Sequence, residues 1–439
     1  MMSRSNASFA HCWTSPVREL WLTIAHTSGA KIYSTALGVF TLFLTARLLG
    51  PEGRGQVAAI TTWAGMFGTF AYLSLGQVAL HRMADDRDQS RFGGLLGSLL
   101  LLTIVLSAGG WVVAVGIHLV APQGAFKGLP LLPLAVGFLA LPFFIWEQYG
   151  SSLLMGLERL RIYNRFQVLG RTIAVAAVFV MVGGFRLGVV GVLSANLLGQ
   201  AIMALGGLGF LFSVAHAKGL SCKPDRGEIK GLLSGGAKLH LNAIGTFLFT
   251  SANVLILNHY HGAAQTGHFQ LATQLLAVLT IIPQSASMVI YGKVASLGPN
   301  NAWPVNRRLL VQVTLGMIAL SVIAALLAPW AIVLMAGERF RPAVTLFQWM
   351  LLGVVGMTFS TLMAPQWIGR GYFWQAAALT LLVGSINVVA NFLLIPRLGA
   401  KGAILAFLGT YAFSILGNGA MALWCGLQTR RQAAEAVQP

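Results

Sequence analysis

The sequence predicts an all-α integral membrane protein with about twelve transmembrane helices. Two observations support this prediction. First, 56% of the 439 residues are hydrophobic and only 9% are charged, whereas a soluble domain carries about 25% charged residues. Second, the apolar residues are collected in long runs separated by short polar gaps. So little charge cannot cover the surface of a soluble protein of this size.

A helix needs about 20 mainly apolar residues to cross the hydrocarbon core of a bilayer. The predicted spans cover residues 29–49, 56–80, 93–121, 129–154, 167–184, 188–214, 234–258, 265–291, 308–335, 343–368, 373–395 and 400–426. These spans divide the chain into an N-terminal segment (1–28), a six-helix half (29–215), a polar linker (216–230), a second six-helix half (231–427) and a tail (428–439). In the first segment Val17, Leu20, Trp21 and Ile24 follow helical spacing, which predicts a short helix in the membrane interface.

The distribution of lysine and arginine predicts the orientation of the spans. If the chain crosses twelve times, 21 of the 29 Lys and Arg residues lie on the side of both termini and 8 lie on the other side. The positive-inside rule therefore places both termini in the cytoplasm. The cations border the spans, so the basic balance indicates membrane phospholipid as partner and not nucleic acid. Cys12, Cys222 and Cys425 have no metal-binding spacing and are expected to be reduced thiols.

Short motifs recur at a nearly constant separation, which indicates an internal duplication. Residues 186–191 (RLGVVG) and 397–402 (RLGAKG) are offset by 211 positions and precede the last span of each half. The other matching pairs are Gly50 with Gly262, Gly55 with Gly267, and Gly156 with Gly369. Because each unit has an even number of spans, the two copies are parallel, and we expect a pseudo-twofold axis along the membrane normal.

Three motifs make the chain resemble a known family. Residues 45–53 (TARLLGPEG), 156–164 (GLERLRIYN) and 387–403 (NVVANFLLIPRLGAKGA) are similar to the turns of the Wzx-type polysaccharide flippases. This family is part of the multidrug/oligosaccharidyl-lipid/polysaccharide exporter superfamily. The motifs concern turns and helix packing, so they do not indicate which sugar is carried.

The resemblance implies a flippase of the bacterial inner membrane. Such a carrier moves an undecaprenyl-pyrophosphate-linked oligosaccharide, or a related glycolipid, by alternating access during surface polysaccharide synthesis. H⁺ or Na⁺ is the implied coupling ion, and polysaccharide assembly proteins are the implied partners. Many relatives carry an acidic residue in span seven where this chain has Asn253, so coupling at that position is in doubt. Glu147 in span four is the remaining acidic candidate for coupling.

Polar stripes on spans one and seven are the candidate substrate site. At 100° per residue, one arc of each helix collects these residues: Lys31, Ser34, Thr41 and Thr45 on span one; Lys238, Asn242, Thr246 and Asn253 on span seven. In a cleft between the halves, the hydroxyls and amides would bind sugar and the lysines would attract the pyrophosphate. The alternative is that the stripes mark close helix packing and that the lysines reach the headgroups.

Further candidates for the cavity lie on spans four, five and eight. Arg171 lies about one turn inside span five, where a cation needs water, a headgroup or a partner. Glu147 either pairs with it, titrates during transport, or is a solvated structural residue. Gln270 and Gln274 form a weaker polar patch on span eight.

The sequence contains no motif for covalent chemistry. It has no Walker A loop, no G-x-S-x-G elbow and no paired carboxylates suited to glycosyl chemistry. We therefore expect a protein that is not an enzyme and that uses no cofactor and no metal. A drug or metabolite exporter of the same fold remains open as an alternative. A membrane glycan polymerase or ligase fits less well, because no predicted outer loop is long.

Overall fold

The computed structural model describes residues 29–85, 90–121 and 124–435, and this part of the chain is almost entirely helical. The predicted interfacial helix in residues 1–28, Cys12 and residues 436–439 lie outside it. In chain order the helices are α3 (Gly29–Ala71), α4 (Leu75–Asp85), α5 (Phe92–Val120), α6 (Leu131–Phe138), α7 (Leu141–Gly156), α8 (Leu160–Val178), η1 (Phe179–Gly184), α9 (Gly188–Ala217), α10 (Arg226–Leu279), α11 (Ile281–Leu297), α12 (Pro299–Ala336), η2 (Glu338–Phe340), α13 (Arg341–Leu352), α14 (Val354–Gly369), α15 (Phe373–Leu398) and α16 (Ala400–Glu435).

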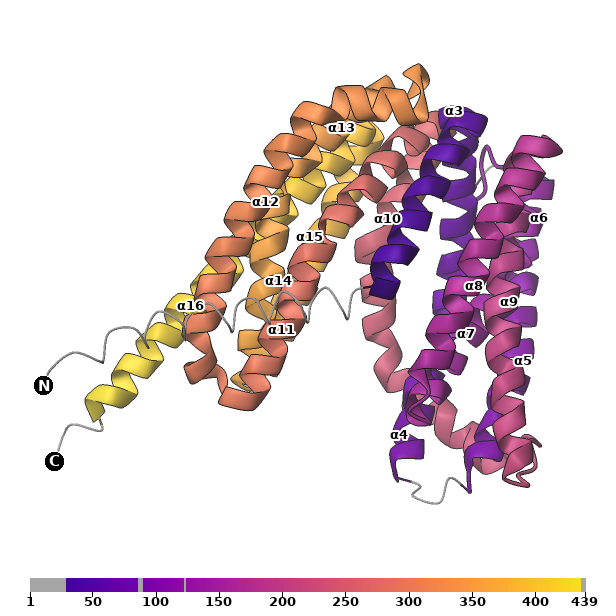
Figure 1. Cartoon of the computed structure of the whole chain (residues 1–439), viewed down its shortest axis with the longest axis horizontal. Helices are drawn as coiled ribbons and strands as arrows, with labels where there is room; N and C mark the ends of the chain where they lie inside the picture. The colour runs from indigo at the N-terminus through magenta and orange to yellow at the C-terminus, as the bar shows by residue number, and fades with distance from the viewer. Residues whose placement is uncertain (1–28, 86–89, 122–123, 436–439) are drawn as a thin grey trace, which may run out of the picture.

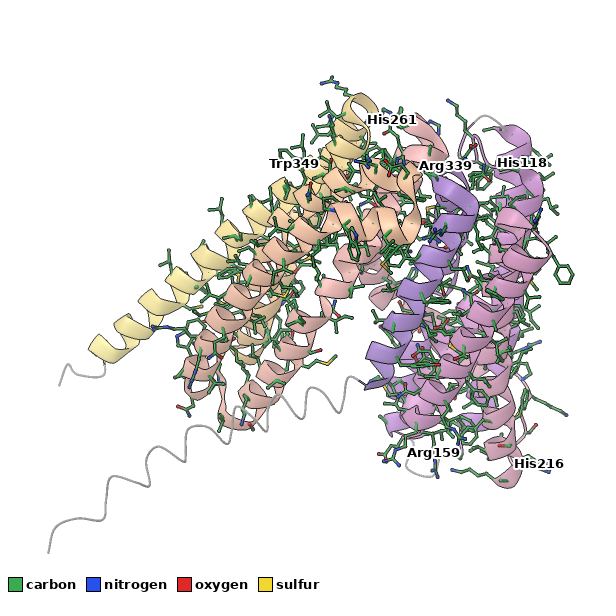
Figure 2. The ribbon with its side chains drawn as sticks, turned by 45° about the horizontal axis from the view of Figure 1, so that its top comes forward. His118, Arg159, His216, His261, Arg339 and Trp349 are labelled. Atoms are coloured by element: carbon green, nitrogen blue, oxygen red, sulfur yellow. The ribbon has the colours of Figure 1, made fainter. Side chains whose placement is uncertain are left out.

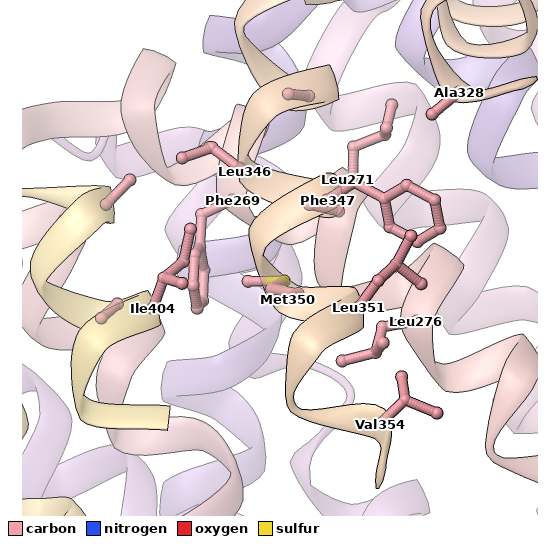
Figure 3. Close-up of a cluster of buried hydrophobic side chains, with 14 of the residues drawn as sticks. Phe269, Leu271, Leu276, Ala328, Leu346, Phe347, Met350, Leu351, Val354 and Ile404 are labelled. Carbon is pink, nitrogen blue, oxygen red and sulfur yellow. The ribbon is translucent and has the colours of Figure 1, made fainter. Parts of the chain in front are cut away.

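The helices form two groups that meet at α3 and α10 (Figure 1). Helices α3–α9 make the N-terminal helix group, and α10–α16 make the C-terminal helix group. Each has its own hydrophobic core: one core is built from residues 57–232, and the other from residues 252–404 together with four residues of α3. In the second core Phe269, Phe347, Met350 and Ile404 pack between α10, α13 and α16 (Figure 3). The two groups diverge from their contact toward the end that holds α4 and α11 (Figure 1).

Two long helices are broken at glycines that adopt the same unusual backbone conformation. Gly50 in α3 has φ 68° and ψ −177°, and Gly262 in α10 has φ 77° and ψ 179°. A side chain is disfavoured at such a positive φ, so glycine is the residue that lets each chain turn there. Pro51 then restarts α3, because its fixed φ suits the first turn of a helix. Each long helix therefore has two arms.

The second arms of α3 and α10 cross at a reciprocal glycine contact. A Cβ atom at Gly55 would overlap the carbonyl oxygen of Ala263, and one at Gly267 would overlap the carbonyl oxygen of Pro51. Only glycine allows the two backbones to approach this closely. We call these four residues the glycine contact. It lies near the end of the molecule where His261 and Arg339 are found, opposite to the end with Arg159 and His216 (Figure 2).

The linker between the groups is held against the N-terminal helix group at that opposite end, which we call the linker end. Asp225 begins α10 as its N-cap, because its carboxylate accepts a hydrogen bond from the Glu228 amide at 2.8 Å. The Glu228 carboxylate is buried and accepts from Arg82 on α4 and from Arg91 beside α5, the latter at 2.8 Å. The Ser98 hydroxyl accepts from the Asp225 amide at 3.0 Å. These contacts hold the start of α10 in place.

Length and composition identify membrane-crossing helices directly. Among the described residues, eight helical segments are long and apolar enough to cross a bilayer, or nine if the bent pair Glu338–Leu352 and Val354–Gly369 is one span. The prediction of an all-α multi-pass membrane protein is thus confirmed.

Turns that match in the sequence also match in backbone conformation. Besides Gly50 and Gly262, two further pairs have positive φ. Glu158 and Gly371 have φ 58° and 78°, and Gly188 and Gly399 have φ 58° and 60°. Each pair lies in the corresponding turns of the two helix groups.

Candidate functional site

Polar side chains of the described chain gather in two places that bear on function. One lies between the two helix groups, beside the glycine contact. The other is a cavity inside the N-terminal helix group. Both are built from helices that are otherwise apolar, so their polar atoms need a structural or functional reason.

Arg54 is a buried cation between the two helix groups. It is 6% exposed, and its guanidinium donates to the Thr45 hydroxyl at 3.2 Å and to the Gln274 side-chain carbonyl at 2.9 Å. Its Nε has no partner in the described part of the chain. Both partners are neutral, and a buried charge without a counter-charge costs several kcal/mol, as an order of magnitude. The site is therefore short of negative charge.

Arg54 also joins the two helix groups physically. Thr45 lies on the first arm of α3, and Gln274 lies on the second arm of α10. The Thr45 hydroxyl additionally donates to the Thr41 carbonyl at 2.6 Å. The structure therefore brings together Thr45 and Gln274, two sequence-predicted residues from different halves, through an arginine that we counted among the outer turns. Gln270, one turn earlier on α10, is half-buried.

The predicted stripe on span seven lies on the first arm of α10. Thr246 is exposed, and Asn253 is half-buried with a side-chain carbonyl that has no hydrogen-bond partner among the described atoms. Neighbouring side chains on α10 face both groups, because Phe247 makes an edge-to-face contact with Phe70 of α3 and Phe249 approaches Gly384 of α15. The backbones of Lys31, Ser34, Lys238 and Asn242 belong to α3 and α10, but their side chains lie outside the described structure.

A cavity of about 310 Å³ lies within the N-terminal helix group, between α3, α6, α7, α8 and α9. We call it the N-group cavity. Its polar lining comes from six residues: Thr61, Glu147, Gln167, Arg171, Asn196 and Gln200. Phe144 and Met203 are among its apolar lining residues. Four glycines also line it, and at three of them, Gly137, Gly170 and Gly199, a Cβ atom would overlap a neighbouring helix, so glycine lets the surrounding helices approach closely.

Glu147 and Arg171, both predicted from the sequence, lie in this cavity and interact electrostatically. The Tyr163 hydroxyl donates to the Glu147 carboxylate at 3.3 Å, and the Gln167 amide donates to the Tyr163 oxygen at 3.3 Å. The side-chain carbonyl of Gln200 is buried without a partner among the described atoms. The cavity thus presents one acid, one cation and several amides.

The sequence did not single out Arg54, Tyr163, Asn196 or Gln200. Arg54 follows the end of an apolar run and looked like a turn residue, because the break at Gly50 was visible but the packing of the second arm was not. A signal was present for the other three. Tyr163 is four residues from Gln167 on α8, and Gln167 is four residues from Arg171. Asn196 and Gln200 are four residues apart on α9, so each set lies on one helical face.

The arrangement of the helices is shared with several solved membrane proteins. The structure is similar to an inward-facing multidrug resistance MATE family transporter of the MOP superfamily, with TM-score 0.71, 16% identity, and 92% of this chain and 96% of that chain covered. It is also similar to the lipid II flippase MurJ in an inward closed conformation, with TM-score 0.72, 13% identity, and 89% and 86% covered. An outward-facing MATE family transporter has TM-score 0.59, 16% identity, and 95% and 96% covered. The chain therefore shares the fold of these proteins.

The family follows from the sequence comparison. The model of the polysaccharide biosynthesis protein family matches residues 20–291, which is more than half of the chain. The chain belongs to this family, and the resemblance stated above is confirmed. A comparison with curated proteins gives no significant match.

Proposed function

We propose that the protein is a flippase that carries an undecaprenyl-pyrophosphate-linked oligosaccharide, or a related glycolipid, across the bacterial cytoplasmic membrane for surface polysaccharide synthesis. The observation that supports this most directly is Arg54. A buried guanidinium held only by neutral groups suits a site that receives an anion during transport, and a diphosphate is such an anion. Family membership supports the link to polysaccharide synthesis.

We further propose twelve spans in two parallel six-helix repeats with both termini in the cytoplasm. Counting each arm of α3 and α10 separately, and joining short consecutive helices, divides the described chain into twelve segments. The three pairs of turns with matching positive φ support the duplication, as does the reciprocal glycine contact. Residues 29–215 and 231–427 are then the two halves. The linker 216–230 joins them on the cytoplasmic side, where segment 1–28 and the tail 428–439 also lie.

In this proposal the substrate enters from the linker end. The helix groups diverge there and are closed at the glycine contact, which corresponds to an inward-open form (Figure 1). The greater similarity to the inward-facing than to the outward-facing MATE structure supports the same assignment. Lys31, near the start of α3, and Lys238, on the first arm of α10, attract the diphosphate, and Arg54 receives it at the closed end. Thr246, Asn253 and the other stripe residues contact sugar hydroxyls.

Coupling and partners belong to the same proposal. Glu147 is the proposed site for coupling to H⁺ or Na⁺, because it is the one acid that lines the N-group cavity. Among the described residues no group of His, Cys, Asp and Glu has an arrangement that could hold a metal ion. Polysaccharide assembly proteins are the expected partners, since they use the translocated glycolipid.

The test is the fate of lipid-linked repeat units in a strain from which the gene is deleted. We expect the units to accumulate on the cytoplasmic leaflet and surface polysaccharide to be lost. Complementation with Lys31→Gln or Lys238→Gln should restore export poorly at normal protein levels, whereas Arg165→Gln on the exposed surface of α8 should restore it fully. Normal translocation in the deletion strain would refute the proposal.

A drug or metabolite exporter is the second candidate, because one similar structure is that of a multidrug resistance MATE family transporter. It predicts that deletion changes drug susceptibility while surface polysaccharide stays intact. The two candidates therefore give opposite results in the same deletion strain.

A further inference from the structure

We propose that the N-group cavity binds a neutral sugar unit of the transported glycolipid while Arg54 holds its diphosphate. This inference rests on the proposed function and assigns the glycan and the anion to two separate subsites. The cavity volume of about 310 Å³ lies at the low end of the range for small-molecule pockets, about 300–1,000 Å³. It therefore suits a small part of a glycan and not a whole repeat unit.

The chemistry of the lining favours a neutral, hydroxylated group. Glu147 and Arg171 together contribute no net charge, so the cavity selects neither a diphosphate nor an organic cation. Gln167, Asn196 and Gln200 each offer an amide that can both donate and accept hydrogen bonds. Sugar hydroxyls also donate and accept, so they match this set.

Two observations indicate that the cavity receives a ligand and is more than a packing defect. The side-chain carbonyl of Gln200 is buried without a hydrogen-bond donor among the described atoms, and such an atom carries a desolvation cost until a ligand or water reaches it. Phe144 lines the same cavity and provides an aromatic ring that can pack against the apolar side of a pyranose.

The position of the cavity relative to Arg54 fits one substrate that occupies both. Thr61, which lines the cavity, follows Arg54 by seven residues on the second arm of α3. Seven residues are close to two turns, so both lie on one face, about 10 Å apart along the helix. Gly65, one turn further, also lines the cavity, and its Cβ position lies 3.9 Å from Phe247 of α10. The cavity wall therefore adjoins the interface between the helix groups.

The proposal predicts which part of the substrate each residue recognises. The experiment measures binding of two probes to the full-length protein in nanodiscs: the lipid-linked repeat unit extracted from the deletion strain, and sugar-free undecaprenyl diphosphate. We expect Gln200→Leu and Glu147→Gln to weaken binding of the glycolipid about ten-fold, which is the effect of one lost hydrogen bond that involves a polar or charged group. Both variants should bind undecaprenyl diphosphate like the wild type, which also shows that they are folded.

Two control variants make the outcomes distinct. Arg54→Met should weaken both probes, and Arg165→Gln, on the exposed surface of the same helix as Arg171, should weaken neither. If the cavity variants bind the glycolipid as tightly as the wild type, the sugar subsite is wrong while the proposed function stands. If the wild-type protein binds neither probe, the proposed function itself fails.

Discussion

Replacement of Arg54 by Met separates the functional role of this arginine from a structural one. Arg54 is the cation that the two helix groups bury between them, with Thr45 and Gln274 as its neutral partners. Met has a similar length and no charge, so it fills the same space without a polar atom. We expect transport to fall more than about ten-fold, which is the effect of losing one charged hydrogen bond to a diphosphate, while the folded protein stays intact.

The expected change in stability follows from opposing contributions. Removing a buried, uncompensated charge removes a penalty of several kcal/mol, as an order of magnitude. The variant loses two hydrogen bonds from a charged donor, each worth about 1.5–3 kcal/mol, and leaves the Gln274 carbonyl without a donor, at about 1–3 kcal/mol. These contributions have opposite signs and the same order of magnitude. We therefore expect the free energy of unfolding to fall by less than the about 3–5 kcal/mol that removing one partner of a compensated buried ion pair costs.

The assay combines denaturant titration of the purified protein with glycolipid translocation in proteoliposomes. Arg47→Met is the matched control, because Arg47 lies on the same helix, is exposed and makes only a long 3.4 Å contact to the Leu334 carbonyl. We expect this control to transport normally. Full transport by Arg54→Met would refute the anion site, and a stability loss above about 3 kcal/mol would show that the arginine is a compensated structural residue.

Three further predictions follow from single contacts. Gly55→Ala should force the glycine contact apart at a cost of about 1–3 kcal/mol. A cysteine placed at the buried position Ala46 should then react with a membrane-impermeant thiol reagent added from the outside. Gly116→Ala is the control, because a side chain there meets open space, and it should leave that cysteine unreactive. Glu228→Gln should lower the free energy of unfolding by about 2 kcal/mol, because the hydrogen bonds from the partly exposed Arg82 and Arg91 lose their charged acceptor. Glu52→Gln on the exposed surface should leave it unchanged in the same titration. Burial raises the pKa of the Cys222 thiol above its ordinary value of 9.0, so its alkylation rate should still be rising at pH 9. A plateau below pH 9 would contradict the burial of the thiol. Labelling of Cys222 from outside intact cells would contradict the proposed orientation.

The sequence determined the features that depend on local composition. The apolar runs specify membrane-crossing helices, because an unpaired backbone group is too costly in hydrocarbon. The turns were also local, since Gly50 and Pro51 carry their own backbone preferences wherever they occur. For the same reason the family could be recognised from short turn motifs. The predicted candidates Thr45, Gln274, Glu147 and Arg171 were found in this way, one helix at a time.

Only the tertiary structure decided which of these residues meet. Arg54 seemed to lie in an outer turn, but α3 restarts directly after Gly50, and the closely packed arms around Gly55 and Gly267 enclose the arginine. In the same way the packing of α7 against α8 brings Glu147 and Arg171 together in the N-group cavity. Within one helix, the spacing of residues in the sequence shows which side chains share a face. The choice of neighbouring face is made by packing between helices far apart in the chain, and a single sequence carries no local signal for it.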